Sequence, residues 1–330
     1  MLKVVIVGSG EMASSLLLGV KEAGHKIVGI FRQERVTTPT ITRLFKDLFA
    51  PSDFYLLSKT YKIPEIKADS VNSQEFRNAV RKLQADIIIV GSWGERFSKK
   101  TILTPRLATI NCHPSYLPAY RGPNPYMSTI SNGEEKTGIT FHLMDENYDT
   151  GEILLQKEVP ILFSDNGYTL KLRCAQQART ALKELLPLIE NGAVNPIKQN
   201  EAKASYFKRI TSKDIYIDFS MSATEIYNKV RGFSPWAFCY LKVRNQFLRI
   251  GYAQVVDLSS TEFYLKNKKY RLPDRYLNTS AGKILARGND WLLCSTIENE
   301  HAILLYDLKL FGFLKHFLTK PFIKSLKNLK

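Results

Sequence analysis

Short apolar runs and amphipathic stretches alternate along the first half of the chain. Runs of strand length predict strands at residues 4–7, 26–31, 86–91, 108–110 and 137–144. Between them, apolar residues at helical spacing predict helices at residues 11–23, 76–84 and 168–191. Strands that alternate with helices form parallel sheets, whose ligands bind beyond the carboxyl ends of the strands. This half of the chain therefore predicts an α/β domain with a Rossmann-like parallel sheet.

The pattern changes after a polar linker at residues 199–205. A helix is predicted at residues 223–230, and short strands are predicted at residues 238–243, 246–253, 262–265, 282–286, 291–295 and 302–308. Many short strands at close spacing are typical of a small β-barrel, here an OB-like one. We expect a first domain over residues 1–198, a barrel-like domain over 206–308 and a basic amphipathic tail over 309–330.

Length and composition are typical of a globular protein with two domains. At 330 residues the chain exceeds the usual size of a single core, and its 44% hydrophobic content is ordinary. No CxxC pair is present, so neither a zinc site nor a disulfide framework is expected from the cysteines at positions 112, 174, 239 and 294. The first residues show no signal-peptide pattern, and no apolar run approaches the roughly 18 residues of a membrane span. We therefore expect a cytoplasmic protein.

Positive charge is concentrated in the C-terminal part. Residues 206–330 hold 21 Lys and Arg against 10 Asp and Glu, a net charge of +11, whereas residues 1–205 hold 26 against 21, a net charge of +5. Such a surface would attract a polyanion such as tRNA through phosphate neutralisation and counterion release. A basic barrel is a common platform for nucleic acid, but it can also serve only solubility, stability or dimer formation. The charge leaves both interpretations open.

Two polar segments that follow predicted strands carry the candidate chemistry. Asn111 and His113 stand two residues apart after the strand at 108–110, so their side chains point the same way. The loop after the strand at 137–144 is rich in Asp, Asn and Gly, which suits a turn that brings Asp149 toward the histidine. An amide, an imidazole and a carboxylate supply an oxyanion donor, a proton acceptor and an orienting or proton-relaying acid. Together they predict an active site for acyl transfer to an amine.

These segments resemble the folate-dependent formyltransferase family. The most specific strings are NxHPSxLPxYRG at residues 111–122 and TGxTxHxMDxxxDTGxIL at residues 137–154, within a resemblance that runs from about residue 4 to about residue 307. Residues 231–236, RGFSPW, are similar to the R-x-[FY]-x-P-W pattern at the start of the family's C-terminal domain. The similarity is greatest to the two-domain members that formylate methionyl-initiator-tRNA. It implies a formyltransferase domain followed by the barrel-like domain.

The resemblance also implies the reaction and its participants. A primary amine attacks the formyl group of 10-formyltetrahydrofolate, and Asn111 and His113 stabilise the developing oxyanion. Asp149, through an ordered water, is expected to keep His113 in its working protonation state and to carry the amine's proton away. No metal is expected. The folate is expected to contact Val90, Gly91, Trp93, Phe97, Ser115, Leu117, Pro118 and Asp145.

The sequence leaves two candidates for the substrate that carries the acceptor amine. The string SYLP at residues 115–118 is similar to the sugar-nucleotide formyltransferases, which act on a 4-amino sugar, and the tRNA enzymes usually have Leu at the position of Tyr116. Purine-pathway members share the catalytic pattern but usually have a single domain. A protein that only binds RNA or a membrane, without catalysis, would not need Asn111, His113 and Asp149 together, so this alternative is disfavoured. We therefore predict an enzyme that acts on methionyl-initiator-tRNA, with an amino-sugar nucleotide as the alternative acceptor.

Acceptor contacts are predicted at Gly10, Arg43, Lys46 and Arg121. Gly10 lies in a GSG turn that mimics a dinucleotide-binding fingerprint, but the acid that should end the second strand of such a site is missing. A nucleotide-binding dehydrogenase is therefore disfavoured, and the turn is expected to border the acceptor.

The segment at residues 32–53 allows two structures. The family resemblance implies a basic loop that binds the acceptor stem of tRNA, and a mobile loop is consistent with its weak periodicity. Alternatively, Leu44, Phe45, Leu48 and Phe49 belong to an amphipathic helix docked on the core.

The tail at residues 309–330 departs from the family pattern. From residue 311 onward apolar residues alternate with lysines, and no acid is present. Such a segment could lie on RNA or on an anionic membrane surface, or it could pack its apolar residues on the barrel. Pro321 would interrupt a single long helix.

Overall fold

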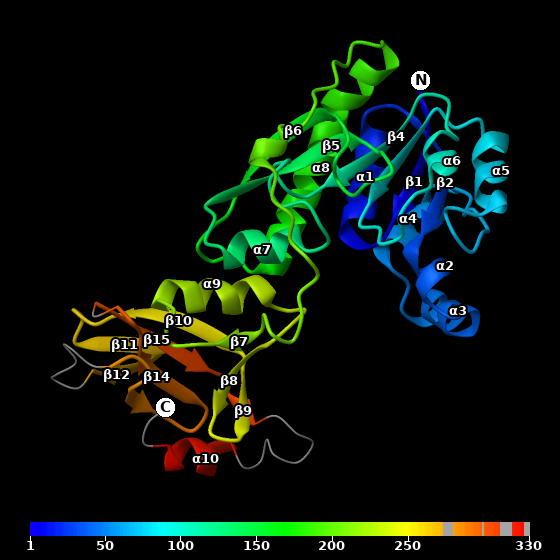
Figure 1. The fold of residues 1–330 in the computed structure, drawn as a ribbon. Helices are drawn as coiled ribbons and strands as arrows, with labels where there is room; N and C mark the ends of the chain where they lie inside the picture. Colours follow the sequence, from blue (N-terminus) through cyan, green and yellow to red (C-terminus); the bar gives the residue numbers. More distant parts are fainter. Residues whose placement is uncertain (273–279, 299, 311–318, 327–330) are drawn as a thin grey trace. The chain divides into compact units, whose positions relative to one another are not determined.

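The computed structural model describes residues 1–272, 280–298, 300–310 and 319–326, which form two compact units (Figure 1). The first unit comprises Met1–Tyr126, Lys136–Ile161 and Thr169–Lys208, and the second comprises Met127–Glu135, Leu162–Tyr168 and Arg209–Lys330. The second unit thus includes two short segments from the first half of the chain, which the hydrophobic pattern does not reveal. The predicted linker at residues 199–205 lies within the first unit.

A six-stranded sheet forms the centre of the first unit. Its strand order is β2-β1-β3-β4-β5-β6, with strands β1 (Lys3–Gly8), β2 (Lys26–Arg32), β3 (Ile87–Gly91), β4 (Ala108–His113), β5 (Lys136–Leu143) and β6 (Ile153–Pro160). The first four strands in this order pair in parallel, as predicted. The last two pair antiparallel, because only a short loop joins β5 to β6 and a tight connection returns the chain beside itself. Strand β6 was not anticipated from the sequence.

Helices with one apolar face cover this sheet. They include α1 (Gly10–Glu22), α4 (Asp53–Thr60), α5 (Gln74–Lys82), α6 (Lys99–Ile102) and most of α8 (Gly167–Glu190), whereas α7 (Pro125–Ser131) belongs mainly to the second unit. Helix α5 begins at Ser73, whose hydroxyl accepts the Phe76 N–H, and it buries Phe76 and Val80 against β2 and β3. Gly19 lets α1 approach α8 closely, because a Cβ there would lie 2.8 Å from the Arg179 carbonyl oxygen.

The segment after β2 is helical, with α2 (Gln33–Thr37) and α3 (Thr40–Phe49). The helical alternative is therefore confirmed. The predicted contact of Leu44 lies outside the described side chains, and docking on the core is wrong for Phe45, Leu48 and Phe49. Their exposed fractions are 66%, 73% and 66%. Helix α3 is instead held by Asp47, which pairs with the buried Arg32, so its apolar stripe faces outward.

The second unit is built from short strands that pair antiparallel, except for β7 and β8, which pair in parallel. Two four-stranded sheets have the orders β10-β15-β14-β13 and β16-β9-β8-β7, and β11 pairs with β12. The strands are β7 (Tyr216–Ile217), β8 (Cys239–Val243), β9 (Gln246–Ile250), β10 (Tyr252–Asp257), β11 (Glu262–Leu265), β12 (Lys268–Arg271), β13 (Ile284–Arg287), β14 (Trp291–Ser295), β15 (His301–Tyr306) and β16 (Lys309–Leu310). The predicted short strands are confirmed within a few residues, although the run predicted at 246–253 covers β9 and only the start of β10. Strands β7, β12 and β16 and most of β10 were missed.

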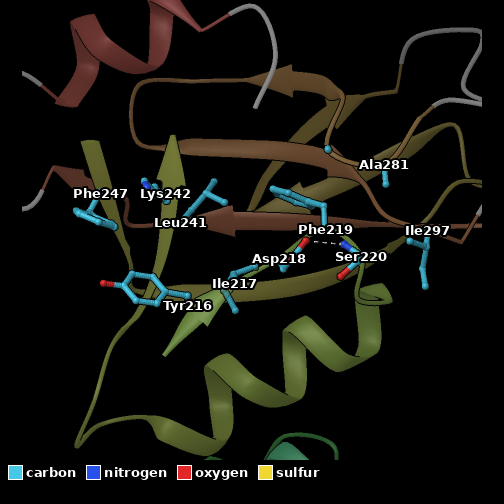
Figure 2. Close-up of a pocket in the computed structure, with 11 residues that line it drawn as sticks. Tyr216, Ile217, Asp218, Phe219, Ser220, Leu241, Lys242, Phe247, Ala281 and Ile297 are labelled. Atoms are coloured by element: carbon cyan, nitrogen blue, oxygen red, sulfur yellow. Dashed lines mark hydrogen bonds between the residues drawn. The ribbon is translucent and has the colours of Figure 1, made fainter. Parts of the chain in front are cut away.

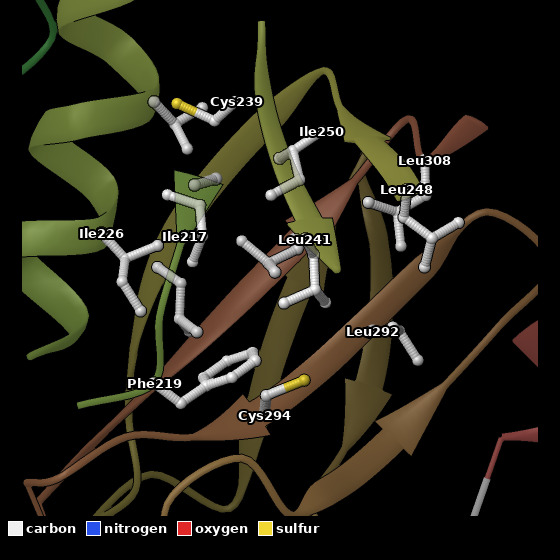
Figure 3. Close-up of a cluster of buried hydrophobic side chains, with 14 of the residues drawn as sticks. Ile217, Phe219, Ile226, Cys239, Leu241, Leu248, Ile250, Leu292, Cys294 and Leu308 are labelled. Carbon is white, nitrogen blue, oxygen red and sulfur yellow. The ribbon is translucent and has the colours of Figure 1, made fainter. Parts of the chain in front are cut away.

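One apolar core is shared by both four-stranded sheets and by α9 (Ala223–Phe233). Leu241 and Leu248 enter it from one sheet and Leu292 from the other (Figure 3). Helix α9 begins with a capping box between Ser222 and Glu225 and buries Ile226 and Val230.

Most of the C-terminal tail lies outside the described residues. Where it is described, α10 (Thr319–Ser325) and the residue after it bury Ile323 and Leu326 in the core of the second unit. The prediction that the tail packs apolar residues on this domain is confirmed for these two side chains.

Candidate active site

Strand β4 and the β5–β6 loop bring the three predicted catalytic side chains together. The Asn111 Nδ2 donates to Asp149 Oδ1 at 3.3 Å, and the His113 Nδ1 lies 3.4 Å from the same oxygen. The other nitrogen of His113 lies 2.9 Å from the carbonyl oxygen of Tyr120. Because Asn111 and His113 stand two apart on a strand, they face the same carboxylate, as the sequence predicts.

Asp149 is held as a carboxylate by the groups around it. Its burial opposes the negative charge, but attraction to His113 and the nearby His142 ring outweigh that cost and hold the pKa well below its usual range. The backbone N–H of Gly122 also donates to Asp149 Oδ2 at 2.9 Å. A carboxylate fixed in this way can orient a histidine or accept a proton from a reacting group.

His142 is a member of the site that sequence reasoning missed. Its Nδ1 lies 2.8 Å from the Leu143 carbonyl, which can only accept, so the ring donates there and accepts at Nε2. The Asn111 Nδ2 lies 3.1 Å from that Nε2, and Asp149 Oδ1 lies 3.7 Å from it. His142 thus orients the amide of Asn111. The conspicuous histidine in the string at residues 137–154 was the available signal.

A small cavity lies between the loop after β3 and the β5–β6 loop. It has a volume of about 60 Å³ and reaches Asn111 and Asp149 at its base. Of the predicted folate contacts, Val90, Trp93, Phe97 and Asp145 line it. The lining residues that were not predicted are Glu95, Arg96, His142, Met144, Asn147 and Tyr148.

The chemistry of this cavity fits a pterin. The buried indole N–H of Trp93 has no hydrogen-bond partner among the described residues, so it can donate to the polar edge of such a ring. Arg96 donates to the Glu146 carbonyl across the mouth of the cavity.

The other predicted folate contacts serve the framework around the cavity. Gly91 allows α1 to pack on the end of β3, because a Cβ there would lie 2.8 Å from Met12. Ser115 and Leu117 are buried, and each bonds to Thr140 on β5 through backbone groups. Pro118 lies beside them, and its carbonyl accepts the Ser205 N–H. None of these four residues lines the cavity.

The glycine turn after β1 is explained by packing. A Cβ at Gly8 would lie 2.1 Å from the Gly91 carbonyl oxygen, so Gly8 is required by the close approach of β1 and β3. Gly10 begins α1 with a φ of 58°, which glycine adopts readily. At the end of β2, Arg32 is enclosed by two carboxylates, those of Asp47 and Glu65. No acid of a dinucleotide site stands at that position.

The predicted acceptor contacts differ in their surroundings. Arg121 is buried, and its guanidinium bonds to Gln199 and Glu201. Arg43 and Lys46 lie on α3, where Lys46 is exposed and Arg43 half-buried.

The second unit contains a larger hollow of about 770 Å³ (Figure 2). The rings of Tyr216 and Phe247 lie 5.5 Å apart on its wall, beside Lys242 on β8. The lining is mainly apolar, with Asp218 as its acidic residue. This hollow offers a binding surface rather than paired acid and base groups.

Two further properties concern the described residues alone. None of the helices there is both long and apolar enough to span a bilayer. Within the same residues, His, Cys, Asp and Glu side chains form no group of three that could hold a metal ion.

Comparisons with known proteins agree with this geometry. Residues 2–186 match the family described as Formyl transferase, and residues 209–311 match Formyl transferase, C-terminal domain. A methionyl-tRNA formyltransferase of Pseudoalteromonas translucida is 31% identical over 79% of this chain and 80% of its own length. One of Thermotoga maritima is 31% identical over 87% of this chain and 90% of its own.

A solved structure shares the fold. An N-formyltransferase from Helicobacter canadensis, in complex with folinic acid and dTDP-3-aminofucose, superposes with a TM-score of 0.65 at 18% identity, over 93% of this chain and 99% of that one. A Rossmann-like domain with an Asn, His and Asp centre defines the class, that of enzymes that transfer a formyl group from folate. The chain belongs to the formyl transferase family. The expected formyl donor, a formyl-tetrahydrofolate, is confirmed with it.

Proposed function

We propose that this enzyme transfers the formyl group of 10-formyltetrahydrofolate to the amino group of methionyl-initiator-tRNA. The observation that carries the reaction is the convergence of Asn111, His113 and His142 on the single carboxylate of Asp149. The acceptor is supported by the names of the relatives at 31% identity and by the positive charge of residues 206–330.

Asn111 and His113 are proposed to stabilise the transition state. Both side chains carry N–H groups at the end of β4, and negative charge develops on the formyl oxygen when an amine attacks the formyl carbon. Donors fixed in advance stabilise such a charge without reorganisation. The formyl oxygen would share these N–H groups with their present acceptors, which are Asp149, His142 and the Tyr120 carbonyl.

Asp149 is proposed to manage the proton of the attacking amine. The amine loses one proton as the new C–N bond forms, and the departing folate nitrogen gains one as its C–N bond breaks. The carboxylate is ionised and adjacent to His113, so it can accept the first proton while His113 supplies the second. No net proton is released.

The folate is proposed to lie in the cavity between the two loops. Bound there, it supplies the activated formyl group. Trp93 would donate its N–H to the pterin, and Val90, Phe97 and Met144 would provide apolar contacts. Asn111 and Asp149 at the base of the cavity would then face the reacting carbon.

Helix α3 is proposed to contact the tRNA. Its exposed rings, Phe45 and Phe49, lie 4.5 Å apart, and Lys46 is exposed on the same helix. Exposed aromatic rings beside positive charge are suited to stacking on bases and to neutralising phosphates. This surface agrees with the acceptor role predicted for Arg43 and Lys46.

An amino-sugar nucleotide is the second candidate acceptor. It is favoured by the SYLP string at residues 115–118, and the fold is shared with an enzyme solved with dTDP-3-aminofucose. The two candidates are separated by incubating the protein with 10-formyltetrahydrofolate and either charged initiator tRNA or a panel of amino-sugar nucleotides. Formylation of the sugars with none of the tRNA would replace the first proposal by the second.

A further inference from the structure

Residues 197–207, here called the connector, are paired with both loops of the active site. Ile197 exchanges two backbone hydrogen bonds with Ile153 at the start of β6. Further along, Ser205 bonds with Pro118 and Arg121 through backbone groups, and the Phe207 N–H donates to the Arg121 carbonyl at 2.8 Å. The connector thus runs as an added strand along the loop that follows β4.

Gln199 links the two loops through one side chain. Its Nε2 donates to the backbone carbonyls of Asp149 and Gly151, both at 2.8 Å. Its Oε1 accepts from the Arg121 guanidinium at 2.7 and 3.1 Å. Glu201 accepts from the same guanidinium at 2.7 and 2.9 Å, which fixes Arg121 toward the connector.

Ser205 supports the turn behind His113. Its hydroxyl accepts the Tyr120 N–H at 2.9 Å, and the Tyr120 carbonyl faces His113 Nε2. The Tyr120 ring also stacks on Phe207, with centroids 4.6 Å apart and planes 10° from parallel. The turn therefore cannot shift without breaking contacts to the connector.

The two residues held in this way have backbone conformations that need support. The φ angles of Tyr120 and Asp149 are 61° and 59°, in the left-handed region that residues other than glycine seldom adopt. Such conformations persist only where the surrounding structure fixes them. The connector provides hydrogen bonds at both positions.

We propose that the connector is a positioning element of the catalytic centre, in which Gln199 places Asp149 and Ser205 places the Tyr120 turn against His113. This inference rests on the proposed roles of His113 and Asp149. The connector lies between the two regions that match the family. According to this proposal, it fixes the geometry of the catalytic centre in addition to joining these regions.

The kinetic test compares substitutions on the connector. Gln199→Met keeps the size but loses every hydrogen bond, and Gln199→Glu keeps an acceptor for Arg121 but cannot donate to Asp149. Both should lower kcat by roughly tenfold or more, the scale of a lost hydrogen bond to a charged or strained group, while the KM for the folate stays within about twofold. Asn200→Ala is the matched control, because the Asn200 side chain bonds only to Ala202 inside the connector.

Ser205 provides an independent pair of variants. Ser205→Ala should lower kcat, and Ser205→Thr should restore it, because threonine keeps the hydroxyl that accepts the Tyr120 N–H. If Gln199→Met fails to fold, Ser205→Ala and Ser205→Thr still test whether the connector positions the catalytic centre.

A second readout does not depend on turnover. The titratable groups around His113 are Asp149 and, across that carboxylate, His142. If Gln199→Met displaces Asp149 from these rings, the pKa of the Asp149 carboxyl, followed by carbon-13 NMR, should rise toward its ordinary value, because attraction to His113 helps to hold it low. The carboxyl of Asp214 in the second unit serves as an internal reference that should not move.

Unchanged kcat in Gln199→Met and Ser205→Ala, together with an unchanged pKa of Asp149 in Gln199→Met, would overturn the inference. If the wild-type protein formylates neither acceptor, the proposed function fails, and the titration still decides whether the connector positions His113 and Asp149.

Discussion

Asp149 illustrates how one buried charge can organise an active site. Asp149→Asn keeps the shape and can still accept a hydrogen bond, but it cannot carry a proton or a charge. We expect a fall in kcat of roughly a hundredfold or more, the usual contribution of a positioned proton-transfer group. Steady-state kinetics with saturating folate measure this, and near-normal turnover in a folded Asp149→Asn protein would contradict the assignment.

The low pKa of Asp149 also predicts how stability depends on pH. Because the folded-state pKa lies below the ordinary value of about 4, the charged carboxylate stabilises the folded state above that pH, and this contribution is lost as the pH falls toward the folded-state pKa. The difference in unfolding free energy between the wild type and Asp149→Asn should therefore be largest near neutral pH and shrink below about pH 4. Urea titrations across this range provide the measurement. A constant difference would mean that the charge does not contribute.

His142 is expected to act through Asn111 and Asp149. His142→Phe keeps a ring of similar size but removes both hydrogen bonds, so Asn111 loses its orientation and Asp149 a stabilising partner. We expect kcat to fall roughly tenfold, the scale of about 1.5 kcal/mol for one hydrogen bond at a charged site. His301→Phe in the second unit is the control and should leave kcat unchanged. If His142→Phe and His301→Phe have equal kcat values, His142 does not contribute to catalysis.

At the scale of elements, α3 depends on one buried ion pair rather than on an apolar interface. Arg32 is 1% exposed and bonds to Asp47 with two 2.8 Å contacts and to Glu65 at 2.8 Å. Its guanidinium also lies over the ring of Tyr55, 4.3 Å from the centroid. This ion pair anchors α3, while Ile41, Phe45, Leu48 and Phe49 remain exposed.

Arg32→Met should release α3 and destabilise the first unit. The variant leaves two largely buried carboxylates without their cation, which typically costs about 3 kcal/mol or more. Hydrogen exchange should show loss of protection in α3 beyond the global change. Arg106→Ala is the control, because the Arg106 side chain is 69% exposed and its pair with Asp86 lies at the surface. Unchanged protection in α3 would show that other contacts hold it.

At the scale of the whole molecule, charge should distinguish the two acceptors. If the acceptor is a tRNA, its KM should rise steeply with salt, with a log–log slope of several, because several phosphates are neutralised on binding. Lys268→Glu should raise the KM for tRNA and leave the KM for the folate unchanged. Lys268 is exposed on β12, whereas Lys266 and Lys269 pair with Asp290 and Glu262. A shallow salt dependence would favour the sugar nucleotide, which offers few charges.

Local patterns in the sequence determined most of the elements and the three central residues of the site. Strands β1 to β5, helices α1, α5 and α8 and the short strands of the second unit follow from hydrophobic periodicity, because each period is set by backbone geometry. Asn111 and His113 could be assigned to one face of a strand for the same reason. Asp149 could be found because the spacing of its loop is specific to the family.

The tertiary structure decided the contacts between segments far apart in the chain. The antiparallel end of the sheet, the outward face of α3, the place of His142 and the pairing of the connector with residues 118–122 have no local signature. Gln199 and Asp149 are separated by 50 residues, and no periodicity relates them. Polar groups that become buried on folding must find hydrogen-bond partners, and these partners are brought near only when distant segments pack together. These contacts are therefore determined by the folded structure.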